Sequence, residues 1–193
     1  MLIYFSRHGQ TDWNVSGRIQ GQVDQPINDI GRAQAKGNGK KLYNLIGDGE
    51  GFDFVASPLG RTRETMELIR GAMGIDPKAY RLDDLLMELN FGDWQGFTES
   101  ELGVEHSELL AARAKDKWNF LPPGQHAESY AMLRNRIEQF MSNVRDKSVV
   151  VTHGGCIRSL FNIYGGLSEK EASNDSVPQD HILRFEDGKL DWV

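Results

Sequence analysis

The stretch LIYFSRHGQTDWN, residues 2–14, places an apolar run directly before an arginine, a histidine and a glycine. The apolar run, Leu2–Phe5, has the composition of a buried strand, and the polar residues begin where that strand ends. Two later apolar runs are followed by polar residues and glycines in the same way, in Val55-Ala56-Ser57-Pro58-Leu59-Gly60-Arg61 and in Val149-Val150-Val151-Thr152-His153-Gly154-Gly155. These three strand ends indicate both the fold and the position of the functional site.

Strand-like runs alternate with helix-like segments along the chain, which is typical of an α/β fold. We expect strands at residues 2–5, 52–56, 80–82 and 149–151, followed by a hairpin at 181–185 and 190–193. Helices are expected over 29–46, after Ser57-Pro58 with Ser57 as the N-cap, over 130–144, after His153 and from Ser168. The expected architecture is a three-layer αβα sandwich with a mostly parallel central sheet.

The composition is that of a soluble globular protein, with 193 residues, 39% of them hydrophobic and 26% charged, and a formal net charge of −6. This length fits a single domain over residues 1–193, and the acidic balance argues against a nucleic-acid partner. Cys156 is the only cysteine, so no internal disulfide can form and a reducing compartment is expected. With no signal peptide and no apolar run of membrane-spanning length, we expect a cytoplasmic protein without a membrane partner.

The segment from residue 88 to residue 125 interrupts the regular alternation of strands and helices. It is rich in aromatic residues around one helix-like stretch, namely Phe91, Trp94, Phe97, Trp118 and Phe120. Long excursions between regular elements are typical of lids and pocket walls. We therefore expect a lid-like insertion over the functional site.

The three strand ends carry side chains that suit an anion. Ligands of open parallel sheets bind at the carboxyl ends of the strands, where Arg7, His8, Arg61 and His153 would meet if the three strands are neighbours. The planar fork of arginine can donate two hydrogen bonds to phosphoryl oxygens, and the N-terminus of the helix after Ser57 would add anion affinity. The sequence therefore predicts a site for a phosphate dianion.

The usual motifs of metal-dependent phosphate chemistry are missing from the sequence. It has no HxH, HExxH or DxD pattern and no GxxxxGK[ST] loop. A metal-free phosphate site can use a side-chain nucleophile, and histidine is among the residues that form covalent intermediates. His8 or His153 is therefore the candidate nucleophile, and we expect neither a metal nor a cofactor.

Four motifs in the chain resemble those of the histidine phosphatase superfamily, also called the phosphoglycerate mutase-like family. They are Arg7-His8-Gly9-Gln10-Thr11 with Trp13-Asn14, Ser57-Pro58-Leu59-x-Arg61-x-x-x-Thr65, Glu88-x-x-Phe91-Gly92-x-Trp94-x-Gly96 and His153-Gly154-Gly155-x-Ile157-Arg158. The motifs occur in the family's order and span nearly the whole chain. The resemblance implies the phosphoglycerate mutase-like form of the αβα sandwich.

The resemblance also implies a role for each matching residue. His8 would attack phosphorus and become phosphohistidine, while Arg7, Arg61 and His153 would hold the phosphoryl oxygens. Glu88 would protonate the leaving oxygen and then activate the hydrolytic water. Substrate binding would further involve Asn14, Gln20, Gly21 and Gly154. The attacking nitrogen of His8 must be unprotonated, so its other ring nitrogen needs a fixed acceptor, which we expect to be a backbone carbonyl of the same loop.

Other polar residues have simpler expected roles. Arg63 and Arg158 are expected to be solvated or structural, with binding of the phosphate as the alternative, and Cys156 is expected to be a small packed side chain. The basic residues Arg113, Lys115 and Lys117 are expected on a solvated helix face, with contact to a distal anionic group of the substrate as the alternative. Many relatives read Pro-Gly-Gly-Glu-Ser where this chain reads PGQHAES at residues 123–129, in a loop expected to shape the substrate pocket.

The resemblance favours a metal-independent phosphomonoester hydrolase acting on a small phosphorylated metabolite. Mutases of the family are usually longer and carry an Arg-His-Tyr-Gly type of motif beside the acid, where this chain reads Leu89-Asn90-Phe91-Gly92-Asp93. A cofactor-dependent phosphoglycerate mutase is the alternative. A non-catalytic binding module would be expected to have lost His8, Arg61, Glu88 or His153, all of which are present. Because symmetric dimers are the commonest assemblies, a homodimer is the default expectation.

Overall fold

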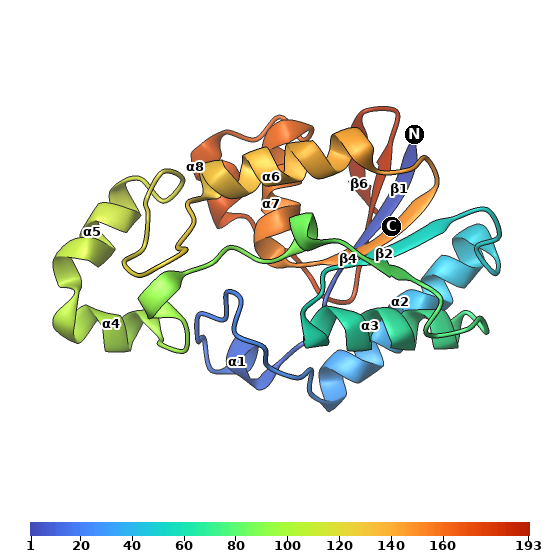
Figure 1. Ribbon diagram of the computed structural model, residues 1–193, viewed down its shortest axis with the longest axis horizontal. Coiled ribbons are helices and arrows are strands. Elements are labelled where there is room, and N and C mark those ends of the chain that lie inside the picture. Colours follow the sequence, from blue (N-terminus) through green and yellow to red (C-terminus); the bar gives the residue numbers. More distant parts are fainter.

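A computed structural model describes residues 1–193 and shows a mixed α/β fold around a six-stranded sheet (Figure 1). The strand order is β3-β2-β4-β1-β5-β6. The strands are β1 (Leu2–Arg7), β2 (Asp53–Ala56), β3 (Arg81–Leu82), β4 (Ser148–Thr152), β5 (Ile182–Glu186) and β6 (Lys189–Trp192). Strands β1 to β4 are parallel, and only β5 runs in the opposite direction, pairing antiparallel with both β1 and β6, so the predicted mostly parallel sheet is confirmed.

Helices cover both faces of the sheet. On one face lie α2 (Asp29–Ile46) and α3 (Gly60–Ala72), and on the other lie α6 (Tyr130–Asn143), α7 (Gly154–Ile163) and α8 (Glu169–Asn174) (Figure 1). Alternate residues of β1 belong to opposite cores, because successive side chains of a strand point to opposite faces. Thus Tyr4 packs with the α2 and α3 core, whereas Ile3 and Phe5 pack with the α6 and α7 core. The predicted three-layer αβα sandwich is confirmed.

The central strand β4 shows why these residues form a buried sheet. All 5 of its residues are buried, since parallel neighbours flank it and helices cover it on both faces. The hairpin of β5 and β6 closes the antiparallel edge through Asp187 and Gly188, with φ angles of 50° and 80°. A two-residue hairpin turn of this kind needs positive φ at both positions, which an Asp-Gly pair tolerates.

Residues 83–129 leave the sheet and return to it. They contain the 3₁₀ helices η1 (Asp84–Leu86) and η2 (Gly92–Trp94) and the α-helices α4 (Glu99–Glu105) and α5 (Ser107–Lys115). Helices α4 and α5 lie away from the sheet, at the left of Figure 1. The sequence predicted one helix-like stretch here, and the structure has two, because Thr98 caps α4 and the chain turns at His106 before α5.

The start of α3 differs from the prediction. Its N-cap is Leu59 and not Ser57, so Pro58 lies outside the helix. The carboxylate of Asp24, from the loop after the short helix α1 (Asp12–Val15), accepts hydrogen bonds from the backbone N–H of Gly60 at 2.7 Å and Arg61 at 3.3 Å. A distant acid therefore takes over the capping role, and the hydroxyl of Ser57 is free for another partner.

The three strand ends meet as predicted, because β2, β4 and β1 are adjacent and parallel. The backbone N–H of His8 donates to the carbonyl oxygen of Thr152 at 3.0 Å, and that of Ser57 donates to Val151 at 3.0 Å. The pairing thus continues one residue past β1 and β2. None of the helices is both long enough and apolar enough to cross a lipid bilayer.

Candidate active site

A cavity of about 130 Å³ lies at the carboxyl ends of the parallel strands. Among its lining residues are seven that the sequence predicted for the site, namely Arg7, His8, Asn14, Gln20, Gly21, Arg61 and Glu88. His153 lies directly beside them, with its ring centroid 5.2 Å from that of His8, and Gly154 begins α7 next to it. The fold therefore brings every predicted site residue to one place.

The ring of His8 is held in one tautomer. Its Nδ1 atom lies 2.8 Å from the carbonyl oxygen of Gly9, which can only accept, so Nδ1 carries the proton and Nε2 has a free lone pair. Burial, followed by the charges of Arg61 and Arg7, lowers the pKa of His8 well below its usual value, which keeps the ring neutral. The backbone carbonyl that the sequence analysis required is thus Gly9 of the same loop.

The two arginines of the site are held by backbone carbonyls and not by carboxylates at close range. Arg61 is almost fully buried and donates from Nη1 to Val23 at 2.8 Å and from Nη2 to Gly21 at 2.6 Å. Arg7 donates from Nη1 to Val177 at 2.8 Å. Burial, with the charge of a neighbouring arginine as the next cause, lowers the pKa of Arg7 to about 10. Both guanidinium groups stay positive at neutral pH and fixed in orientation.

His153 completes a set of buried nitrogens that have no protein partner. Its Nε2 atom lies 2.8 Å from the hydroxyl of Ser57, and its Nδ1 atom has no partner. The Nε atoms of Arg7 and Arg61 are likewise buried without a partner. A buried donor left unsatisfied costs about 1–3 kcal/mol. Two such guanidinium donors near His8 make this position favourable for an oxyanion, and Nδ1 of His153 can donate as well when its Nε2 accepts from Ser57.

The remaining predicted binding residues frame the cavity. Asn14 uses its Oδ1 atom to accept from the backbone N–H of Thr11 and from Nε2 of Gln179, both at 3.0 Å, which leaves its amide N–H groups for a ligand. The Oε1 atom of Gln20 is buried without a partner. Gly21 has a φ of 55°, a conformation that favours glycine, and its carbonyl oxygen holds Arg61.

The carboxylate of Glu88 is fixed at the N-terminus of α7. Its Oε2 atom accepts from the backbone N–H of Gly155 at 3.1 Å, and its Oε1 atom accepts from Leu89 at 2.9 Å. A Cβ atom on Gly155 would collide with Oε1 of Glu88, so the second glycine after His153 makes room for the acid.

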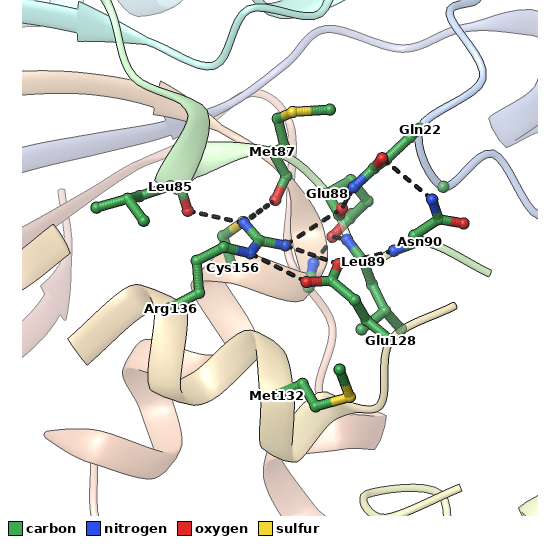
Figure 2. Close-up of polar contacts among 12 residues, drawn as sticks. Gln22, Leu85, Met87, Glu88, Leu89, Asn90, Glu128, Met132, Arg136 and Cys156 are labelled. Atoms are coloured by element: carbon green, nitrogen blue, oxygen red, sulfur yellow. Dashed lines mark hydrogen bonds and ion pairs between the residues drawn. The ribbon is translucent and has the colours of Figure 1, made fainter. Parts of the chain in front are cut away.

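The backbone around Glu88 is held by an arginine that the sequence analysis did not single out (Figure 2). Nη1 of Arg136 donates to the carbonyl oxygens of Leu85 at 2.8 Å and Met87 at 2.7 Å. The same guanidinium forms a two-pronged ion pair with Glu128, at 3.1 Å from Nε and 2.9 Å from Nη2. Arg136 on α6 thus ties Glu128 to the irregular segment between η1 and η2, which carries Glu88.

Glu128 and Gln22 hold the backbone of residues 88–90 by further hydrogen bonds (Figure 2). The Oε2 atom of Glu128 accepts from the backbone N–H of Asn90 at 3.0 Å. Nε2 of Gln22 donates to the carbonyl oxygen of Glu88 at 3.0 Å, and its Oε1 accepts from Nδ2 of Asn90 at 3.2 Å. The unusual loop at 123–129 therefore still supplies a glutamate, and Ser129 after it caps α6.

Arg158 occupies a different position from the one expected. A solvated or structural arginine was the first expectation, whereas Arg158 is only partly exposed and lines the same cavity as His8 and Glu88. It lies four residues after Gly154 on α7, so one helical turn brings its side chain back to the strand ends. Arg63 is exposed on α3, as predicted.

The surroundings of the site contain no arrangement typical of a metal centre or a reactive thiol. No group of three or more histidine, cysteine, aspartate or glutamate side chains is arranged to hold a metal ion. Cys156 is buried under the site, with its Sγ atom 3.3 Å from the carbonyl oxygen of Met87, and burial raises its pKa to about 12. This thiol is a packed side chain, as predicted.

A larger cavity, of about 540 Å³, lies on the surface between α2 and α3. Its charged lining residues are of both signs, namely Lys36, Lys40, Glu64 and Glu67. None of the buried unpartnered nitrogens of the strand ends faces it, because those atoms belong to residues that line or adjoin the smaller cavity. The candidate active site is therefore identified by the polar groups that converge on the smaller cavity and not by the size of the cavity.

Comparison with known proteins places this fold and sequence in a family. A solved structure from Escherichia coli, of a candidate alpha-ribazole-5'-P phosphatase, matches with a TM-score of 0.81 over 100% of this chain and 94% of that chain, at 22% identity. That likeness shows the fold. The family model of the histidine phosphatase superfamily (branch 1) matches residues 3–191. The chain belongs to this superfamily.

Relatives in the superfamily include enzymes of two kinds. A glucosyl-3-phosphoglycerate phosphatase from Mycobacterium tuberculosis is 31% identical over 166 residues, which are 80% of this chain and 70% of that protein. A 2,3-bisphosphoglycerate-dependent phosphoglycerate mutase from Beijerinckia indica is 28% identical over 175 residues, which are 86% of this chain and 82% of that protein. Members of the superfamily are thus phosphatases or mutases, and the family alone does not choose between them.

Proposed function

We propose that this protein is a metal-independent phosphomonoester hydrolase that acts through a phosphohistidine on a small phosphorylated metabolite. The observation that carries the proposal is the fixed tautomer of His8. Its neutral Nε2 faces a position surrounded by Nε of Arg7, Nε of Arg61 and Nδ1 of His153, all of them buried without partners. A nucleophilic lone pair near two unsatisfied guanidinium donors is the arrangement that phosphoryl transfer requires, and Nδ1 of His153 becomes a third donor when Nε2 accepts from the hydroxyl of Ser57.

In the first step Nε2 of His8 attacks phosphorus, and the bond between phosphorus and the leaving oxygen breaks. Glu88 gives its proton to that oxygen, so the product alcohol leaves neutral. The charge on the three equatorial oxygens is stabilised by Arg7, Arg61 and His153 and by the amide of Asn14. The carbonyl of Gly9 stabilises the positive charge that develops on the ring of His8.

In the second step a water molecule attacks the phosphorus of phosphohistidine. Glu88, now a carboxylate, takes a proton from this water, and the bond between Nε2 of His8 and phosphorus breaks. Inorganic phosphate leaves, and both His8 and Glu88 return to their starting protonation states. The same carboxylate therefore serves as acid and then as base, which requires a fixed position that Gly155 and Arg136 supply.

The alternative is a phosphoglycerate mutase, in which phosphohistidine returns its phosphoryl group to the substrate. Relatives of both kinds match this chain, so the family leaves the alternative open. After Glu88 the chain reads Leu89-Asn90-Phe91-Gly92, so the buried side chain of Leu89 stands where the mutase motif has its arginine. The absence of this arginine from the position next to the acid favours the hydrolase.

The proposal is tested by phosphate release from a panel of phosphomonoesters with a chelator present throughout. Turnover that persists with the chelator and disappears in His8→Ala supports the hydrolase. Isomerisation of 3-phosphoglycerate that depends on added 2,3-bisphosphoglycerate, without phosphate release, would replace it with the mutase. If neither phosphate release nor isomerisation is detected, both enzymatic proposals are contradicted and a binding module on this fold is favoured.

A further inference from the structure

The cavity holds one more cation than a single phosphoryl group needs. Arg7, Arg61 and the two histidines already surround the position of the transferred phosphoryl group. Arg158 adds a second guanidinium beside Arg7, with Gly154 between them. The point where a side chain of Gly154 would begin lies 3.5 Å both from Nε of Arg7 and from Nη1 of Arg158. Two positive groups therefore flank the same gap.

Arg158 has no carboxylate partner to balance its charge. It donates from Nε to the carbonyl oxygen of Asp175 at 2.8 Å, and its Nη1 atom lies 3.4 Å from the hydroxyl of Tyr130. Arg18, another arginine of the cavity wall, is by contrast neutralised by Glu101 at 2.7 Å. A guanidinium that is oriented by neutral groups and has no counter-ion is suited to bind an anion from solution.

The positive charge continues outward from Arg158. Lys117, after α5, is half-buried and donates to Oδ1 of Asn174 at 3.0 Å, and it forms no ion pair. Burial, followed by the charges of Arg113 and Arg158, lowers the pKa of Lys117 to about 8. Of these three cations only Arg113 has a carboxylate partner, Glu99 at 2.6 Å. Arg158 and Lys117 are thus two neighbouring cations without a carboxylate partner, in a chain whose formal net charge is −6.

We infer that Arg158, with the hydroxyl of Tyr130 beside it and Lys117 farther out, binds a second anionic group of the substrate. The preferred substrates are then phosphomonoesters that carry a carboxylate or a second phosphoryl group a few atoms from the phosphorus that His8 attacks. This inference rests on the proposed function and narrows its substrate class. The competing interpretation is that Arg158 binds the transferred phosphoryl group itself, together with Arg7.

The experiment compares substrates that differ only in the second anion. O-phosphoserine is paired with O-phosphoethanolamine, 3-phosphoglycerate with glycerol 3-phosphate, and a hexose bisphosphate with its monophosphate. We expect kcat/KM of the wild-type protein to be higher for the member that carries the second anionic group, in at least one pair, by about tenfold or more. This is the size of one charge-assisted contact. A preference in the two carboxylate pairs would identify the second anionic group as a carboxylate, and a preference in the bisphosphate pair would identify it as a phosphoryl group.

Three variants assign the preference to these residues. Arg158→Met is expected to lower the preference ratio towards one, Arg158→Lys to keep part of it, and Lys117→Met to reduce it about threefold, as a more distant charge would. Lys115→Met is the matched control, because Lys115 is exposed two residues before Lys117 and forms no side-chain hydrogen bond, whereas Lys117 is half-buried against Asn174. If Arg158→Met does not fold, Arg158→Lys and Lys117→Met still test the ratio.

Two results would overturn the inference. One is a wild-type ratio near one for every pair, and the other is an Arg158→Met variant that loses activity equally on both members, which would assign Arg158 to the transferred phosphoryl group. Calorimetric binding of two unreactive phosphonates, 2-amino-4-phosphonobutyrate and 3-aminopropylphosphonate, separates this inference from the proposed function. If the carboxylate-bearing phosphonate binds more tightly, this difference depends on Arg158, and no substrate is turned over, the hydrolase is contradicted while the anion subsite is supported.

Discussion

The Nδ1 atom of His8 lies 2.8 Å from the carbonyl oxygen of Gly9, and this one contact decides which nitrogen can react. The carbonyl accepts a proton that Nδ1 must carry, so the lone pair is on Nε2. The loop itself is fixed, because the backbone N–H of Gly9 donates to Oγ1 of Thr65 at 3.0 Å. A residue on α3 therefore helps to set the orientation of the nucleophile on β1.

The buried histidines predict how stability depends on pH. The pKa values of His8 and His153 are lowered well below 6.5, chiefly by burial, so the folded protein keeps both rings neutral where the unfolded chain binds protons. The free energy of unfolding should therefore fall as the pH drops below about 6.5, by about 1.4 kcal/mol per histidine between pH 7.5 and 5.5. Urea unfolding at these two values, in buffers without phosphate, measures the loss.

The variant His8→Asn isolates one of the two contributions. It should reduce the loss between the two pH values by about 1.4 kcal/mol, because an amide takes up no proton in this range. His126→Asn in an exposed loop is the matched control, since it removes a histidine without touching the buried pair. An undiminished loss in His8→Asn would show that the ring is protonated in the folded state.

Gly155 is predicted to be intolerant of even one added methyl group. In Gly155→Ala the new Cβ collides with Oε1 of Glu88, so the acid must move away from the backbone N–H that holds it. We expect kcat to fall by about a hundredfold, the usual cost of misplacing a reacting group by an ångström. Steady-state kinetics measure the loss.

Gly37→Ala is the control for this glycine substitution. Gly37 lies within α2, and a Cβ there has nothing within 4 Å. The change should leave kcat unaltered and stabilise the fold by about 0.5–1 kcal/mol, because alanine restricts the unfolded chain. Equal kinetics for the two variants would mean that the position of Glu88 does not limit turnover.

Arg136 is predicted to act on catalysis through Glu88. The pair of Arg136 and Glu128 has side-chain exposures of 17% and 16%, so Arg136→Met leaves a nearly buried carboxylate without its partner. The free energy of unfolding should fall by about 3 kcal/mol. More specifically, kcat should fall more for alkyl phosphates, whose leaving oxygen needs a proton, than for p-nitrophenyl phosphate, whose leaving group does not.

The matched control for Arg136 is Arg134→Met on the same helix. Arg134 pairs with Glu138 at 2.9 Å on the surface, so its loss should cost about 0.5 kcal/mol and leave the dependence on leaving group unchanged. Arg136→Lys keeps the charge but not the two-pronged geometry, and it should recover part of kcat. If Arg136→Met slows both substrates equally, its role is structural and does not pass through the acid.

The variant Glu88→Gln is predicted to separate the two chemical steps. With p-nitrophenyl phosphate the first step needs no acid, so His8 should be phosphorylated in a burst of one nitrophenol per protein molecule. The second step then lacks its base and should be slower by a factor of about 10²–10⁴. Stopped-flow absorbance measures both phases. Turnover at the wild-type rate without a burst would assign the base to another group.

The strand ends and the site residues could be predicted because their signals are local. An apolar run followed by polar residues and glycine marks the end of a buried strand, and adjacent parallel strands bring such ends together. This pattern occurs at the ends of β1, β2 and β4, which are adjacent in the sheet, and it brings together Arg7, His8, Arg61 and His153. The αβα layers follow equally from the alternation of strands and helices.

The cap of α3 could not be predicted, because its partner is distant in the chain. A serine before a proline is typical of a helix start, and local rules favoured Ser57 for that reason. In the structure Asp24, from a loop 36 residues away, holds the N–H of Gly60, while Ser57 faces His153. The choice between the two depends on the path of the loop after α1, which periodicity does not show.

Arg136 and Arg158 were missed because a helical pattern does not reveal which surface a polar residue meets. Arg136 is flanked in helical spacing by the core residues Leu133 and Ile137, which places it near the buried face of α6. Arg158 follows Gly154 by one helical turn. The position of Arg136 next to core residues of α6, and that of Arg158 one turn after Gly154, could both have been recognised from the sequence. The two helices within residues 88–125 show no such periodicity, and the role of this segment as a lid over the site stays a prediction.

The central claim is that a phosphoryl group is carried covalently on Nε2 of His8. Isotope-labelled substrate, mixed with the protein in the presence of a chelator and quenched in alkali within milliseconds, should leave acid-labile label on the peptide that contains His8. His8→Ala should show neither label nor turnover. Label on His153, or undiminished turnover of His8→Ala without any label, would contradict the account.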